Sequence, residues 1–164
     1  MPPDPRVLET RSWLAKAASD LRAAAHEFRA DPPLLDDIVF HAQQATEKAL
    51  KGFLAWHDRP FRKTHDPVEL GRACAELDAT LEGLLRRAAP LTEYAWRFRY
   101  PGDPEEPAED EARSALGVAR QVHEPSCPAY RPKRARKNSF ASFYCPETRR
   151  AGWPRRESPS RRNR

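Results

Sequence analysis

Apolar residues recur at helical spacing in the segment FHAQQATEKALKGFLAW, which runs from Phe40 to Trp56. At roughly 100° per residue, six apolar positions fall on one face, and a second apolar group lies across from it. The first group is Ile38, Ala42, Ala45, Ala49, Phe53 and Trp56, and the second is Phe40, Leu50 and Leu54. A helix with two apolar sides is covered on both, by neighbouring helices or by a second copy of the chain. The pattern therefore predicts the central helix of a bundle.

A polar stripe, His41, Gln44 and Lys48, follows the flank of this predicted helix. His41 and Lys48 are two turns, or roughly 10 Å, apart. That span is too long for one hydrogen-bonded pair, but it suits two phosphates of a nucleotide or contacts with a partner helix; a solvated flank is the alternative. Glu47 and Lys51, four residues apart, predict an ordinary helical ion pair on the order of a few tenths of a kcal/mol.

Other segments also show helical periodicity, and none alternates apolar and polar residues like a strand. Pro32-Pro33 ends the first helix, Asp66 can cap the third with Pro67 at its first position, and Pro90 predicts a kink in the fourth. The expected helices are 7–30, 34–57, 67–77, 81–98 and 108–122. Short connections favour antiparallel neighbours, so the predicted fold is all-α, an antiparallel bundle of about five helices.

Charge divides the chain near residue 124. Residues 125–164 contain twelve Lys and Arg against two Glu, whereas residues 1–124 contain 17 basic and 22 acidic residues, a net charge of −5. We therefore expect a helical domain over 1–124 and a basic tail over 125–164. Six prolines and few aliphatic residues predict disorder in the tail. Its basic runs could bind nucleic acid; alternatively, the tail is out-of-frame translation after a helix that Pro125 cuts short.

Cysteine usage and hydropathy indicate a cytoplasmic protein. Cys74, Cys127 and Cys145 are odd in number and widely spaced, which favours neither a disulfide framework nor a metal site. The chain lacks a signal-peptide pattern and has no apolar run near the ~20 residues that span a bilayer. The His57-Asp58 and His65-Asp66 pairs have no further ligands at convincing spacing, so we expect neither a metal nor a cofactor.

Three segments together resemble the HEPN domain: FHAQQATEKALKGFL, KTHD at 63–66, and LTEYAWRFRYPGD at 91–103. They occur in the order and spacing of that family, and the resemblance covers roughly residues 11–124. It implies a bundle of about five helices and a homodimer. It also implies pairing, in prokaryotes, with a small nucleotidyltransferase as a toxin–antitoxin module.

Many proteins of that family are metal-independent ribonucleases in which Arg is followed, four to six residues later, by His. Such catalysis needs a base for the 2′-hydroxyl, an acid for the leaving oxygen and a cation beside the phosphorane. Neither Arg97 nor Arg99 has a His at that spacing. The resemblance is therefore to the RYP-type branch, for which binding of nucleotides or other polyanions is proposed. The alternative is a ribonuclease that uses Arg97 or Arg99 with a displaced base, His41 or His65.

The expected function is binding of a nucleotide, RNA or a partner nucleotidyltransferase. Arg99 can grip phosphate with its guanidinium fork and Tyr100 can stack; alternatively, Arg99 bonds the terminal carbonyls of its helix. Arg97 points about 200° away from Arg99, so one of the two is solvated. His65, just before a helix, organises its loop or takes part in chemistry. The ligand-binding candidates are Arg99, Tyr100, Lys48, His41 and Gln44.

Overall fold

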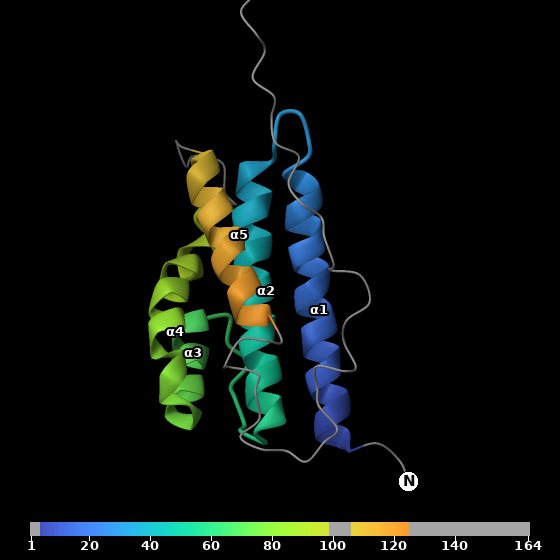
Figure 1. Ribbon diagram of the computed structural model, residues 1–164, viewed down its shortest axis with the longest axis vertical. Helices are drawn as coiled ribbons and strands as arrows, with labels where there is room; N and C mark the ends of the chain where they lie inside the picture. Colours follow the sequence, from blue (N-terminus) through green and yellow to red (C-terminus); the bar gives the residue numbers. More distant parts are fainter. Residues whose placement is uncertain (1–3, 99–105, 125–164) are drawn as a thin grey trace, which may run out of the picture. The chain divides into compact units, whose positions relative to one another are not determined.

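The central segment forms α2 (Leu35–Trp56), against which the other long helices pack. The computed structural model describes residues 4–98 and 106–124, all within one compact unit, Met1–Lys133. Fourteen of the 22 residues of α2 are buried, among them members of both predicted apolar groups. Figure 1 shows α2 running antiparallel to α1 (Pro5–Glu27), with α3 and α4 on the side away from α1. The prediction of a central helix covered on two sides is confirmed.

Local sequence signals set most helix ends. Asp4 caps α1 by accepting from the backbone N–H of Arg6, and Pro5 is its first residue. Asp66 caps α3 (Pro67–Leu77) in the same way, with its Oδ1 2.8 Å from the Val68 nitrogen. Three acidic residues occupy the first turn of α5 (Glu109–His123), where the helix dipole favours negative charge. The predicted boundaries therefore hold to within about three residues for four helices.

The fourth helix differs from its prediction. A short 3-10 turn, η1 (Ala79–Leu81), leads into α4 (Glu82–Ala88), and the chain then continues as a second 3-10 segment, η2 (Ala89–Ala95), before turning. Pro90 lies in the first turn of η2, and proline cannot donate an α-helical hydrogen bond. The break at Pro90 is confirmed, but the α-helical continuation through Phe98 is wrong.

The core contains side chains from α1, α2, η2 and α5. Ala42 and Ala45 of α2 join Leu91 and Tyr94 of η2 in one buried cluster, together with Leu116 of α5. The segment that carries the predicted arginines thus packs through its apolar residues against an apolar face of α2. This packing fixes where the chain leaves the bundle before residue 99.

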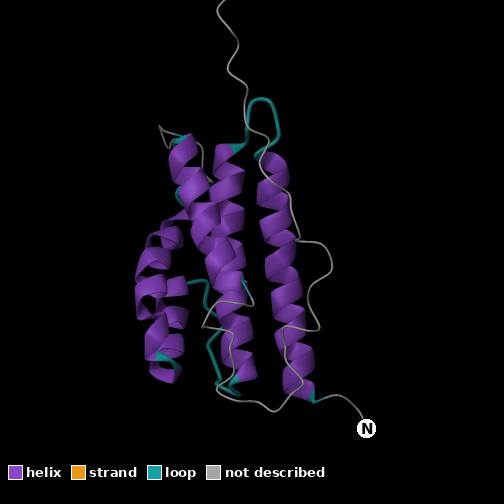
Figure 2. Ribbon diagram, viewed as in Figure 1, coloured by secondary structure: helices purple, strands orange, loops and turns teal. Residues whose placement is uncertain are grey.

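Within the described residues the molecule consists of helices and loops only, as Figure 2 shows. The all-α bundle prediction is confirmed. The 125–164 tail and the 99–105 segment lie outside the described residues, and so do Arg99 and Tyr100. No helix in the described ranges is long and apolar enough to cross a membrane.

Candidate functional site

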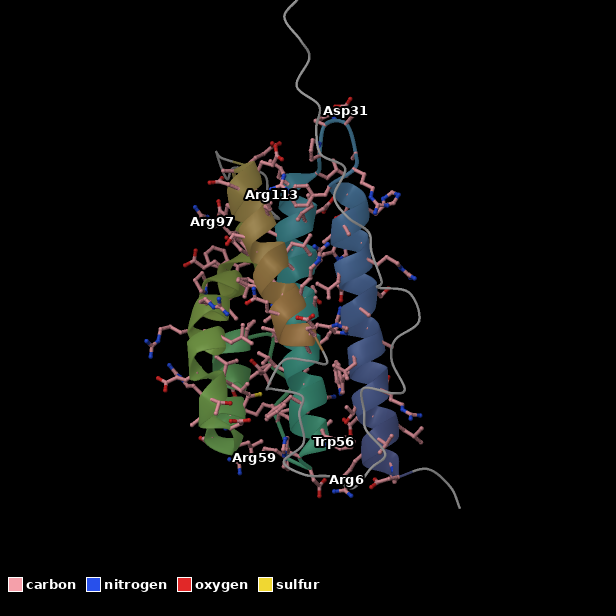
Figure 3. The ribbon with its side chains drawn as sticks, viewed as in Figure 1. Arg6, Asp31, Trp56, Arg59, Arg97 and Arg113 are labelled. Atoms are coloured by element: carbon pink, nitrogen blue, oxygen red, sulfur yellow. The ribbon has the colours of Figure 1, made fainter. Side chains whose placement is uncertain are left out.

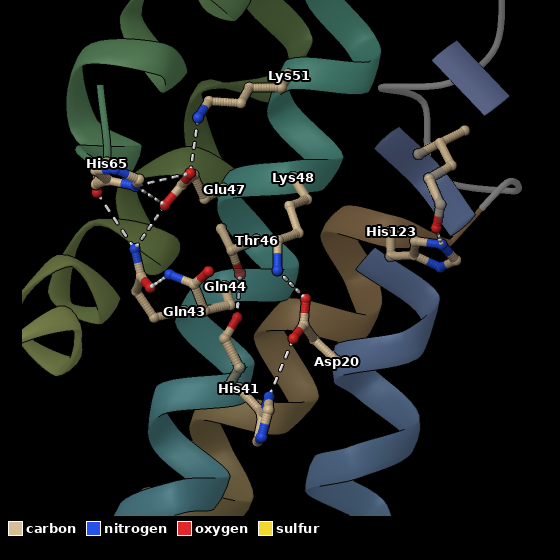
Figure 4. Close-up of polar contacts among 12 residues, drawn as sticks. Asp20, His41, Gln43, Gln44, Thr46, Glu47, Lys48, Lys51, His65 and His123 are labelled. Atoms are coloured by element: carbon tan, nitrogen blue, oxygen red, sulfur yellow. Dashed lines mark hydrogen bonds and ion pairs between the residues drawn. The ribbon is translucent and has the colours of Figure 1, made fainter. Parts of the chain in front are cut away.

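The polar stripe of α2 contacts α1 through Asp20. One oxygen of this carboxylate lies 3.1 Å from Nδ1 of His41, and the other accepts a 2.5 Å hydrogen bond from Nζ of Lys48 (Figure 4). His41 and Lys48 are too far apart to pair with each other, yet a single carboxylate on the facing helix contacts both. Asp20 is only 13% exposed at its side chain, so this seam is partly withdrawn from water.

His41 also contacts a second carboxylate of α1. Its Nε2 lies 3.6 Å from Oε1 of Glu27, so both ring nitrogens face an acidic oxygen. Burial raises the pKa of Glu27, and the neighbouring His41 opposes that shift. The other oxygen, Oε2 of Glu27, is buried without a hydrogen-bond partner among the described residues. His41 therefore lies between two acids.

These contacts occupy the polar side chains that were predicted to bind a ligand. Asp20 contacts both His41 and Lys48 and offsets the positive charge of Lys48, and Gln44 donates a 2.8 Å hydrogen bond to Gln43. His41 and Lys48 therefore join α2 to α1. η2 packs on an apolar face of α2.

A second polar network is centred on Glu47, which is buried. Its carboxylate accepts a 2.7 Å hydrogen bond from Lys51 and a 3.3 Å bond from Gln43. Lys51 also lies over the ring of Trp13, 5.2 Å from its centroid. The predicted helical ion pair between Glu47 and Lys51 is confirmed, but it is buried, since the two side chains are only 3% and 7% exposed.

His65 contacts this network from outside the bundle. Its Nδ1 lies 3.3 Å from Oε1 and 3.4 Å from Oε2 of Glu47, whereas its side chain is 82% exposed. Gln43 donates to the backbone carbonyl of His65 at 3.3 Å, so the same buried amide holds the loop. The backbone of His65 is thus held by Gln43, and its imidazole is presented to solvent with one nitrogen on a buried carboxylate (Figure 4).

The end of η2 carries exposed side chains with binding character. Trp96 is 58% exposed, the most exposed of the large hydrophobic residues in the described ranges. Arg97 is solvated, lies 3.6 Å from the carboxylate of Glu93 and stands over the ring of Phe98. Figure 3 places Arg97 near one end of the bundle and Arg59 near the other. The predicted roles of Arg99 and Tyr100 stay predictions.

Tyr94 anchors this end of η2 to α5. Its hydroxyl donates a 2.7 Å hydrogen bond to Glu111, and its ring stacks on Phe98 with centroids 6.0 Å apart. Burial and the bond to Glu111 raise the pKa of Tyr94, so the phenol stays protonated and keeps donating. Trp96 and Arg97 therefore leave the bundle from a fixed position.

Catalytic geometry distinguishes the two predicted bases. His41 has carboxylates at both ring nitrogens, whereas His65 has one nitrogen at Glu47 and an exposed ring. The structure does not bring His41 and His65 together, since each contacts a different carboxylate. In the described part of the chain, no group of three acidic, His or Cys side chains could hold a metal ion.

Several functional candidates were missed in the sequence. Asp20 and Glu27 of α1 carry no motif, and Trp96 was not distinguished from the apolar residues around it. Helical position could have indicated Asp20, since it follows Ala17 by three residues and precedes Ala24 by four, and both alanines are buried.

The fold and these contacts define a class of helical bundle whose central helix carries buried polar networks. A family model described as the HEPN domain matches residues 10–130, which is more than half of the chain. The chain belongs to the HEPN domain family. Comparison with curated proteins and with solved structures returns no match.

Proposed function

We propose that this HEPN-domain protein binds a nucleotide or RNA at the end of η2, through Trp96, Arg97 and the following Arg99-Tyr100. The observation that carries the proposal is the exposed side chain of Trp96, followed directly in the chain by Arg97, whose guanidinium is partly exposed. Aromatic rings stack on nucleic-acid bases whatever their identity, and arginine grips phosphate with two parallel donors. His41, Lys48 and Gln44 then support the bundle and do not contact the ligand.

The net charge of the helical domain limits how this site could bind an anionic ligand. Residues 1–124 carry a net charge of −5, so the long-range field of the helical domain does not attract a polyanion. Affinity must then come from local contacts, such as stacking on Trp96 and phosphate binding by Arg99. A ligand with both a base and a phosphate fits better than a simple anion.

Isothermal titration of the full-length protein with ATP, GTP and short single-stranded RNA tests the proposal. Trp96→Ala should weaken binding about tenfold or more, because a stacked base contributes roughly 1–3 kcal/mol. Arg99→Ala should weaken binding as well. Arg97→Ala should weaken binding too, and Arg59→Ala is its matched control, since both arginines are about half-exposed and paired with a glutamate but Arg59 lies at the opposite end (Figure 3). Equal affinity in Trp96→Ala and Arg59→Ala would refute this location.

The same end of the molecule suits a protein partner. Exposed tryptophan and arginine are the residue types that dominate protein interfaces, and the family suggests a homodimer and a cognate nucleotidyltransferase in a toxin–antitoxin pair. Light scattering of the purified protein reports the dimer. Co-expression with a nucleotidyltransferase from an adjacent gene, followed by co-purification of wild type and Trp96→Ala, reports the partner.

A second candidate function is metal-independent cleavage of RNA with a displaced base. The specific observation is that His65 keeps an exposed ring, which His41 does not. Incubation with total RNA in EDTA tests it. Cleavage lost in both His65→Ala and Arg99→Ala but kept in His41→Ala supports this function, and unchanged RNA in the wild type excludes it.

A further inference from the structure

His65 differs from the other exposed histidines in what holds its ring. Its Nδ1 faces both oxygens of the buried Glu47, and the rest of its side chain is open to solvent. His26 and His57 are also exposed residues, but neither forms an ion pair with a carboxylate within the described ranges. Of these three exposed histidines, His65 is the one whose ring contacts a carboxylate, whereas His57 packs on the ring of Phe53; His26 and His57 serve as internal comparisons.

The carboxylate behind His65 is itself held in place. Lys51 and Gln43 both donate to Glu47, and Gln44 fixes the amide of Gln43 from the other side. The backbone of His65 is also held, since its carbonyl accepts from Gln43. Burying an ion pair gives little net stability compared with apolar residues of the same volume. Folding stability alone therefore does not explain why a buried ion pair contacts an exposed imidazole at this position.

An ionised carboxylate only accepts hydrogen bonds, so the nitrogen facing Glu47 carries the proton. In the neutral ring Nε2 then has a free lone pair. We propose that Nε2 of His65 is a nucleophile that accepts a phosphoryl group, while Glu47 positions the ring and stabilises the positive charge that the ring gains. Glu47 is the positioning residue, and His65 forms the covalent bond.

The loop before His65 supplies the charge that a phosphoryl group requires. Arg62 and Lys63 are both exposed, and their turn is closed by a 2.8 Å hydrogen bond from the Thr64 nitrogen to the Arg62 carbonyl. This positive charge, two and three residues before the nucleophile in the chain, favours the approach of an anionic phosphoryl donor to the loop. A phosphoryl donor with a good leaving group, of the phosphoramidate class, fits this environment.

The transfer balances in atoms and charge. The lone pair of Nε2 attacks phosphorus, the Nε2–P bond forms, and the P–N bond of the phosphoramidate zwitterion breaks to release ammonia. The positive charge of the donor's ammonium group passes to the imidazole ring, whose Nδ1–H stays directed at Glu47. The product is a phosphohistidine whose ring cation faces a buried carboxylate.

This inference is independent of the proposed nucleotide binding, because the reaction contains neither nucleotide nor RNA. Potassium phosphoramidate is incubated with the full-length protein, and peptide mass spectrometry under alkaline conditions follows phosphorylation of each histidine with time. We expect His65 to be modified several-fold faster than His26 and His57. Equal rates at the three exposed histidines would overturn the proposal, and this comparison requires no variant.

Variants test the role of Glu47. Glu47→Gln should slow modification of His65 about tenfold or more, as when a group that orients a reactive imidazole is removed, and leave His26 unchanged. Because Glu47→Gln leaves Lys51 buried without its partner, the double variant Glu47→Leu/Lys51→Met provides a second test in a bundle without the ion pair. Wild-type rates at His65 in both folded variants would refute the positioning role.

Discussion

Lys51→Met should destabilise the bundle strongly, although Lys51 forms a single ion pair among the residues that the structure describes. Lys51 and Glu47 are nearly inaccessible to water, and the ammonium donates at 2.7 Å. Removing one partner of a buried pair leaves an uncompensated charge and costs about 3–5 kcal/mol. Gln43 and His65 still contact Glu47, so we expect the lower end of that range, about 3 kcal/mol. For a domain of this size the melting temperature should fall by roughly 10 °C.

The matched control is Arg86→Met. Arg86 and Glu82 have the same four-residue spacing within one helix, but their side chains are 77% and 68% exposed. An exposed pair of this kind contributes about 0.5 kcal/mol or less. Urea denaturation followed by circular dichroism gives the free energy of unfolding for both variants. The difference between them reports the effect of burial, since each pair joins a glutamate to a cation four residues later in the same helix.

The double variant Glu47→Leu/Lys51→Met completes the test. Removing both charges also removes the desolvation cost, so stability should return to within about 1 kcal/mol of wild type. A double variant as unstable as Lys51→Met would show that the loss comes from packing, for example from the contact of Lys51 with Trp13. Equal losses in Lys51→Met and Arg86→Met would refute the claim that burial decides the energy.

Two further predictions concern helix packing and pH. Gly117→Ala should stabilise the folded protein by about 0.5–1 kcal/mol, because nothing lies within 4 Å of the new methyl group. Gly52→Ala should lose that gain, because its methyl group would lie 3.2 Å from Leu14. Thermal melts of the two variants compare them. Burial lowers the pKa of His123, whose Nε2 lies 3.2 Å from the Leu14 carbonyl oxygen. Once the pH falls below 6.5, the ordinary pKa of histidine, the unfolded chain binds a proton at His123 that the folded protein does not. Stability should therefore decrease from pH 7 towards the lowered pKa, and urea titrations of wild type and His123→Gln should show a smaller decrease in the variant.

The fold was predictable because local signals and periodicity agree. Two apolar groups on one helix, proline at helix starts and Asp66 as a cap each specify a boundary or a face independently of distant residues. The fourth helix was predicted less well. Its apolar spacing fits both an α-helix and a 3-10 segment over a few residues, and only the packing of Leu91 and Tyr94 on α2 decides between them.

The polar contacts were predicted poorly because they depend on the facing helix. The spacing of His41 and Lys48 correctly excluded a direct pair, but a carboxylate from α1 joins them. For Glu47 the sequence did contain a signal. Glu47 precedes Leu50 and Leu54 by three and seven residues, so it lies on the same helix face as the second apolar group. That position predicts a buried side chain for Glu47.

The two polar networks of α2 have different accessibility, and this difference bears on function. The Asp20 network places both nitrogens of His41 against acids between two helices, whereas the Glu47 network ends in an imidazole that is open to solvent. A polar network that only joins helices gains nothing by extending to an exposed ring, since the contact with an exposed partner adds little stability. Stability of His65→Ala close to wild type, within about 0.5 kcal/mol, would separate the exposed ring from the structural pair behind it. The ring of His65 would then contribute little to folding, which leaves chemistry as its role.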